Sequence, residues 1–170
     1  IGEAIASSKS FPMQLVETLQ CKGISIAQPT IVARTGWTTQ ELSSAMDHQV
    51  LESSYDLVTL LIGVNNQYRG LSLQDYRYEF KQLLLRAIKL ADGKPEHVVV
   101  LSIPDYGCTP FGETKQVAIS AEIDLFNAVN QDVATALNVP YVSVTCISRR
   151  AREDGDLVAL DGLHPSAEMY

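Results

Sequence analysis

The segment DLVTLLIGVNN, residues 56–66, is a nearly continuous apolar run that ends in a glycine and two asparagines. A short apolar run without alternation of polar residues is typical of a strand that is buried on both faces. Residues 97–103, HVVVLSI, repeat this pattern and lead into a loop with two prolines and two glycines, residues 104–112. Strands buried on both faces occur almost only where helices cover both sides of a parallel sheet, so the two segments predict an α/β fold.

Amphipathic segments alternate with the apolar ones along the chain. Their apolar spacing predicts helices over residues 11–19 behind a Ser10 cap, from Thr38 or Thr39 to Met46, from Ser72 or Leu73 to Ala91, over residues 116–137, and from Ser166 onward. Two more strands are expected, at residues 24–33, which Pro29 interrupts, and at residues 141–144. Short links between strand and helix favour a parallel sheet with helices on both faces. Residues that follow the strands then meet at the carboxyl edge of that sheet.

Composition limits the class of protein. The chain has 170 residues, with 13 Lys and Arg against 20 Asp and Glu, a net charge of −7 and a pI near 4.9. This length suits a single domain over residues 1–170, and the acidic balance argues against a nucleic-acid partner, which would require clustered cations. The apolar runs are too short to span a membrane. The three cysteines share no spacing typical of a disulfide framework or a metal site.

The sharpest candidate for chemistry is the pentapeptide Asp161-Gly162-Leu163-His164-Pro165. A carboxylate three residues before a histidine, in a loop shaped by glycine and proline, can turn back onto the imidazole Nδ1–H and leave Nε2 to act as a base. The same spacing also fits a simple turn in which Asp161 bonds the backbone and His164 is merely exposed.

Two further candidates follow expected strands. Asn65, two residues after Gly63 at the end of the first apolar run, could direct a side-chain N–H at a developing oxyanion, although asparagine and glycine also suit turns. Gly36, in the sequence Arg34-Thr35-Gly36-Trp37, could present its backbone N–H to a ligand, or it could form an ordinary strand-to-helix turn.

Taken together and in this order, Gly36, Gly63-Val64-Asn65 and residues 161–165 resemble the later conserved blocks of the SGNH (GDSL-type) hydrolases. The resemblance covers nearly the whole chain. It implies a three-layer, flavodoxin-like fold and serine-dependent ester hydrolysis. In its terms His164 is the base, Asp161 orients it, and the Gly36 N–H and the Asn65 side chain stabilise the oxyanion. The family's usual aspartate after that asparagine is Asn66 here.

The first block of that family, Gly-Asp-Ser with the nucleophilic serine, is missing from residues 1–170. Residues 1–3, IGE, are similar to the positions just after that block, so we expect the sequence to start a few residues after the nucleophile. Tyr170 falls within the expected helix from Ser166, so we expect the other end to be short as well. Ser7, Ser8 and Ser10 lack the strand-end turn that would expose a nucleophile.

The leading hypothesis is therefore a serine esterase that hydrolyses a small or short-acyl carboxylic ester with a Ser-His-Asp triad. It needs neither a metal nor an organic cofactor, and its partner is a small-molecule ester. The alternative is a catalytically silent binding domain that kept the hydrolase shape. A third hypothesis makes Cys108 the nucleophile. The acyl group, the compartment and the oligomeric state are left open by the sequence.

Overall fold

The sheet of the computed structural model, which describes residues 1–170, consists of three parallel strands in the order β1–β2–β3. The strands are β1 (Val58–Leu60), β2 (Val98–Leu101) and β3 (Tyr141–Val142). The central strand β2 pairs with both neighbours, and its Val98 and Val100 are completely buried. The apolar run of β2 follows from this burial, because all its residues except Val99 are buried. β1 was expected to be buried on both faces as well, but its Thr59 is exposed and only Leu60 is buried.

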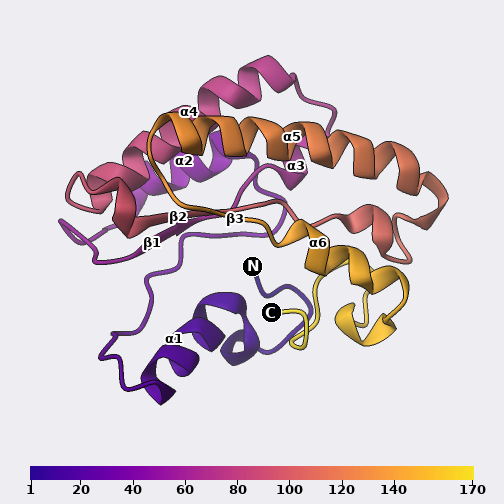
Figure 1. Ribbon diagram of the computed structural model, residues 1–170, viewed down its shortest axis with the longest axis horizontal. Helices are drawn as coiled ribbons and strands as arrows, with labels where there is room; N and C mark the ends of the chain where they lie inside the picture. Colours follow the sequence, from indigo (N-terminus) through magenta and orange to yellow (C-terminus); the bar gives the residue numbers. More distant parts are fainter.

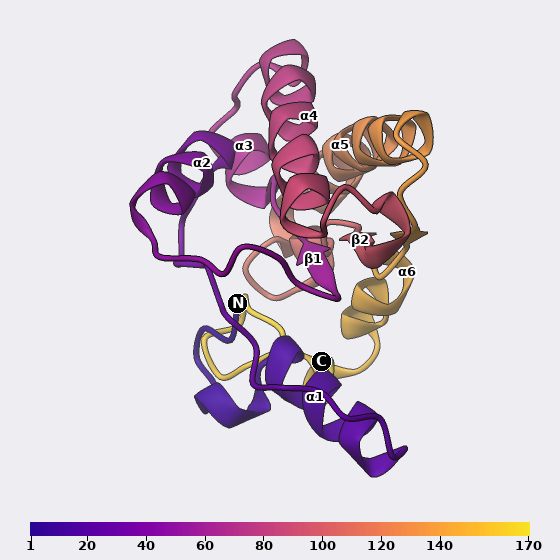
Figure 2. The ribbon, with the colours of Figure 1, turned by 90° about the vertical axis from the view of Figure 1, so that its left-hand side faces the viewer.

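Helices lie on both sides of this sheet, which confirms the predicted α/β architecture. The α-helices are α1 (Phe11–Cys21), α2 (Thr39–His48), α3 (Val64–Tyr68), α4 (Leu73–Leu90), α5 (Gln116–Ala136) and α6 (Thr145–Ser148). In Figures 1 and 2, α2, α4 and α5 lie on one side of the strands and α1 and α6 on the other. Short 3₁₀ turns lie between them, at Ser7–Lys9, Pro95–His97, Tyr106–Cys108, Glu113–Lys115, Arg149–Arg152 and Gly155–Leu157.

The core forms between the sheet and the two long helices. Tyr76 of α4 stacks at an angle on Phe126 of α5, with ring centroids 4.6 Å apart, and both rings are buried. The Tyr76 hydroxyl donates a hydrogen bond to Ile62 O at 3.0 Å or to Asn130 Oδ1 at 2.6 Å. The bond to Ile62 O connects α4 to the last residue before Gly63, where the chain leaves the sheet.

Gly63 occupies a place that no other residue could fill without strain. Its φ is +126°, and a Cβ built on it would lie 2.3 Å from Tyr76 Oη and 2.8 Å from Ile103 Cδ1. The chain therefore turns directly from β1 into α3, whose N-cap is Gly63. This places Asn65 in the first turn of a helix that was not predicted.

Side-chain hydrogen bonds cap the starts of two α-helices, α2 and α4. Thr38 and Glu41 form the reciprocal capping box of α2, and the Ser72 side chain accepts from the Asp75 N–H at the start of α4. The predicted Ser10 cap is only partly right. Ser10 is the N-cap residue of α1, but its hydroxyl donates to Ser7 O instead of accepting a helix N–H.

Residues 24–33 were predicted to form a strand, and this prediction is wrong. The segment is irregular, and Ile24 and Ile31 are about half exposed, at 50% and 42%. Extended backbone becomes a strand only when a neighbour pairs with it, and β1 pairs with β2 alone. Pro29 also lacks the N–H that a ladder requires.

The two ends of the chain lie side by side (Figures 1 and 2). The Gly2 N–H donates to the Tyr170 hydroxyl at 3.2 Å, and Gln14 Nε2 donates to Ala167 O at 2.8 Å. The expected helix from Ser166 is a single turn, with one long bond from the Tyr170 N–H to Ser166 O at 3.4 Å. None of the helices combines the length and apolar character that crossing a bilayer requires.

Candidate active site

Asp161 and His164 form a close pair. His164 Nδ1 lies 2.6 Å from Asp161 Oδ2, while the other carboxylate oxygen accepts the backbone N–H groups of Leu163 and His164, each at 3.0 Å. The structure contains both contacts that the pentapeptide allowed: Asp161 bonds the backbone of the turn, and its other oxygen holds the imidazole. Two hydrogen bonds lower the pKa of Asp161 to about 2. The bond from the His164 backbone N–H has the larger effect, and the bond with the His164 ring has the next largest. The carboxylate is thus charged at any pH at which an imidazole can act as a base.

The loop that carries His164 is held by two backbone hydrogen bonds. The Ala159 N–H donates to His164 O at 2.8 Å, and the Phe111 N–H donates to Gly162 O at 3.0 Å. The second bond joins the histidine loop to the loop that follows β2. The only hydrogen bond of the imidazole is the one at Nδ1, so Nε2 is available for a substrate or a nucleophile.

Asn65 lies next to the turn that contains Gly36, although 29 positions separate the two residues in the sequence. Gly36 has a φ of +86° within a turn that the Trp37 N–H closes on Arg34 O at 3.3 Å. Asn65 Nδ2 donates to Trp37 O at 3.0 Å. A primary amide nitrogen carries two hydrogens, so the second hydrogen of Asn65 Nδ2 is left for another acceptor.

Asn66 is a structural residue, and the sequence did not reveal its role. It is 1% exposed, its Oδ1 accepts the Thr39 N–H at 3.0 Å, and its Nδ2 donates to Thr39 Oγ1 at 2.6 Å. The side chain therefore fastens the start of α2 to α3. The donor role at Nδ2 suits an asparagine here, because an ionised carboxylate has no hydrogen to donate.

An exposed aromatic cluster stands between α3 and the histidine loop. We define it as Tyr68, Tyr106 and Phe111, whose ring centroids lie 6.1–6.3 Å from one another. Tyr68 and Phe111 remain 59% and 52% exposed. Partial burial raises the pKa of Tyr106, so its hydroxyl is neutral at physiological pH. The backbone bond from Phe111 to Gly162 attaches this aromatic cluster to the loop of His164.

Arg69, directly after α3, contacts both the Gly36 turn and α2. Its Nη2 donates to Gly36 O at 2.5 Å, and its Nη1 lies 3.3 Å from Glu41 Oε2. The sequence carried no sign of these two contacts, because Gly36 and Glu41 are distant from Arg69 along the chain.

The alternative nucleophiles within residues 1–170 lie in other surroundings. Cys108 is buried, with its Sγ 3.6 Å from Gln116 Nε2 and 4.0 Å from Asp105 Oδ2, and no hydrogen bond joins it to His164. The Ser10 hydroxyl is taken by Ser7 O. No group of three or more His, Cys, Asp or Glu side chains is arranged to hold a metal ion.

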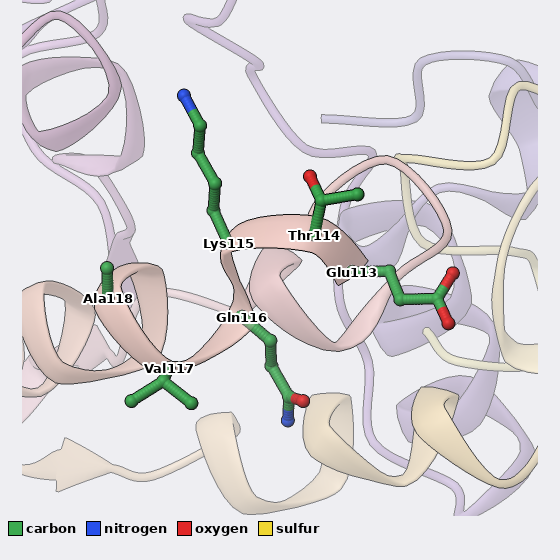
Figure 3. Close-up of a pocket in the computed structure, with 6 residues that line it drawn as sticks. All are labelled: Glu113, Thr114, Lys115, Gln116, Val117 and Ala118. Atoms are coloured by element: carbon green, nitrogen blue, oxygen red, sulfur yellow. The ribbon is translucent and has the colours of Figure 1, made fainter.

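A hollow of about 400 Å³ lies away from these residues, at the start of α5. Its lining is one continuous stretch, Glu113–Ala118. Figure 3 shows that the side chains diverge, with Thr114 and Lys115 pointing to one side and Gln116 and Val117 to the other. The hollow contains none of the candidate residues and no converging polar groups, so we do not assign the site to it.

Comparisons with known proteins agree with this architecture. The model of the GDSL-like Lipase/Acylhydrolase family matches residues 2–170. No curated protein matches the sequence.

Solved structures show the same fold at low identity. The psychrotrophic esterase EstA from Pseudoalteromonas sp. superposes with a TM-score of 0.72 at 14% identity, over 98% of this chain and 82% of that chain. The lipase/acylhydrolase from Enterococcus faecalis gives 0.72 at 20% identity, over 96% and 79%. The acetylxylan esterase Axe2 from Geobacillus stearothermophilus gives 0.70 at 20% identity, over 92% and 74%.

Proposed function

Because the chain belongs to the GDSL-like lipase/acylhydrolase family and is therefore a carboxylic ester hydrolase, we propose that it hydrolyses a short-acyl ester with a serine nucleophile, His164 as the base and Asp161 as its partner. The bond of 2.6 Å between His164 Nδ1 and Asp161 Oδ2 carries this proposal. No serine of residues 1–170 hydrogen-bonds to the imidazole. We therefore propose that the nucleophile is a serine outside these residues and that residues 1–170 belong to one catalytic domain.

In the first step the serine oxygen attacks the ester carbonyl carbon, and His164 Nε2 takes the hydroxyl proton. Asp161 contributes in two ways. Its hydrogen bond keeps the proton of the neutral ring on Nδ1, so that Nε2 is the basic nitrogen, and its charge stabilises the imidazolium that forms. The pKa of about 2 ensures that this charge is present throughout.

The carbonyl oxygen becomes an oxyanion in the tetrahedral intermediate. We propose that it accepts hydrogen bonds from the Gly36 N–H and from the second hydrogen of Asn65 Nδ2. The contact of Asn65 with Trp37 O supports this pairing, because it orients the amide and brings it beside the Gly36 turn. Donors that are held in place before the reaction stabilise developing charge without reorganisation, and each contributes roughly 10²–10³ in rate.

Collapse of the intermediate breaks the bond to the alcohol, which leaves with the proton from His164. Water then attacks the acyl-enzyme while His164 Nε2 accepts a proton from it, and the second intermediate releases the acid and restores the serine hydroxyl. No redox step and no metal ion is needed for this sequence, since every proton moves between serine, imidazole, alcohol and water.

The aromatic cluster supports a small substrate. Tyr68 and Phe111 form an exposed apolar wall that the bond between Phe111 and Gly162 joins to the histidine loop. The name of one structural neighbour, an acetylxylan esterase, fits the same class of acyl group. We expect the full-length protein to cleave p-nitrophenyl acetate at least about tenfold faster, in kcat/KM, than p-nitrophenyl decanoate. Equal or reversed rates would exclude the short-acyl proposal.

A fluorophosphonate probe separates this function from a silent binding domain. The probe forms a covalent bond only with an activated serine, so the full-length protein should be labelled and the His164→Ala variant should not. An unlabelled protein that still binds esters would favour the binding domain. Labelling that persists in His164→Ala would reject His164 as the base.

A further inference from the structure

Arg69 connects the two proposed oxyanion donors. It is the C-cap of α3, one turn after Asn65, and its N–H donates to Asn65 O at 3.1 Å. Its Nη2 donates to Gly36 O at 2.5 Å. Asn65 itself donates to the next carbonyl, Trp37 O, at 3.0 Å. One turn of α3 thus holds two consecutive carbonyl groups of the Gly36 turn.

Apart from Arg69 and Asn65, the Gly36 turn is held by a hydrogen bond from the Thr35 hydroxyl to the Glu3 carboxylate and by the packing of Trp37 against the core. Glycine at a φ of +86° adopts many other conformations at low cost, and the turn is closed by a single bond of 3.3 Å. Arg34 and Thr35 are exposed, and the preceding residues 24–33 pair with no strand. These contacts hold the residues on either side of Gly36, whereas the bond from Arg69 holds the carbonyl of the glycine itself.

The other arm of the guanidinium gives Arg69 a fixed support. Its Nη1 lies 3.3 Å from Glu41 Oε2, and the same carboxylate oxygen accepts the Thr38 N–H at 2.7 Å in the capping box of α2. A planar guanidinium can serve two acceptors at once in a defined geometry, which a lysine ammonium on its flexible stem does less well. Arg69 consequently joins the start of α2, the Gly36 turn and the end of α3.

We propose that Arg69 is a positioning residue for ester hydrolysis, because its contact with Gly36 O holds the Gly36 N–H at a constant distance from the Asn65 amide. This inference rests on the proposed function. Arg69 does not touch the reacting atoms in this role, and it acts through the two donors. A displacement of such donors by about 1 Å can cost 10²-fold in rate, whereas substrate binding is little affected.

The test compares Arg69→Met with Arg77→Met in the full-length protein. Arg77 is a matched control on α4, since its side chain is 49% exposed against 46% for Arg69 and it forms a bond of 2.9 Å with Asp132. For Arg69→Met we expect kcat on p-nitrophenyl acetate to fall by about 10- to 100-fold while KM stays within about twofold. Arg69→Lys should fall between Arg69→Met and the parent, and Arg77→Met should match the parent.

A second readout does not depend on turnover. In ¹⁵N relaxation and amide exchange experiments, the Gly36 N–H should become more mobile and exchange at least about tenfold faster in Arg69→Met, and it should be unchanged in Arg77→Met. An unchanged Gly36 amide would overturn the inference. An unchanged kcat would do the same, as would a loss that falls mainly on KM, since Arg69 would then contact substrate.

The outcomes also separate this inference from the proposed function. A parent protein without esterase activity would reject the proposed function, and the amide measurement would still decide whether Arg69 holds Gly36. An active parent with an unchanged kcat in Arg69→Met would reject the positioning role alone.

Discussion

Alanine substitutions of the adjacent residues Asn65 and Asn66 should have opposite consequences. The side chain of Asn65 makes one hydrogen bond, to Trp37 O at 3.0 Å, and has a second hydrogen for the oxyanion. Asn66 is 1% exposed and makes two hydrogen bonds, both with Thr39. Asn65 should therefore matter for the transition state, and Asn66 for the stability of the fold.

The magnitudes derive from these contacts. Asn65→Ala removes one oxyanion donor, which lowers kcat by roughly 10²–10³, or about 3–4 kcal/mol of transition-state stabilisation. It also removes one partly buried hydrogen bond, at about 1 kcal/mol of folding stability. Asn66→Ala leaves the buried Thr39 N–H without a partner and removes the bond that the Thr39 hydroxyl accepts, while that hydroxyl still donates to Glu79. The expected loss of stability is about 3 kcal/mol. For a domain of this size that loss lowers Tm by roughly 6–12 °C.

The assay measures kcat on p-nitrophenyl acetate at a temperature at which both variants are folded, together with urea unfolding of each. We expect Asn66→Ala to keep kcat within about fivefold of the parent and Asn65→Ala to keep most of its stability. This division of roles is refuted if Asn65→Ala retains the parental kcat, or if the two variants lose activity to the same extent.

The remaining predictions concern the base His164, the turn at Gly63 before α3, and the titration of Asp161 at low pH. His164→Ala should lower kcat by roughly 10⁴-fold or more with an unchanged unfolding midpoint, and measurable turnover near the parental rate would reject the assigned base. Gly63→Ala should cost several kcal/mol or prevent folding, because its Cβ would lie 2.3 Å from Tyr76 Oη at a φ of +126°, and a stable variant in urea unfolding would contradict this packing. The pKa of Asp161 is about 2 in the fold against 3.8 for the free side chain, so its charge stabilises the fold above about pH 4 and this contribution is lost as the pH falls through 2. A ¹³C NMR titration of the Asp161 carboxyl should have its midpoint near 2, and a midpoint near 3.8 would disprove the hydrogen-bonded turn.

Features that depend on neighbouring residues could be predicted from the sequence. The pairing of Asp161 with His164 spans three residues, and the Thr38 cap of α2 also spans three, so the residue types and spacing were sufficient. Strands β1 and β2 were predictable because both are short and nearly continuous apolar runs, although only β2 is largely buried.

Features that depend on distant partners could not be predicted in this way. Residues 24–33 have the composition of a strand, but a strand needs a paired neighbour, which no local pattern reports. Asn66 bonds to a residue 27 positions away and Arg69 to one 33 positions away. Asn65 and Asn66 have the same side chain, and only their directions from α3 distinguish their roles.

A crystal structure of the full-length protein after reaction with a phosphonate ester tests the central claim most directly, because the phosphonyl group mimics the tetrahedral intermediate. We predict an adduct on a serine, with the phosphonyl oxygen about 2.7–3.1 Å from both the Gly36 N and Asn65 Nδ2, and with His164 Nε2 facing the serine oxygen. An adduct on another residue type, or a phosphonyl oxygen that contacts neither Gly36 nor Asn65, would contradict the account.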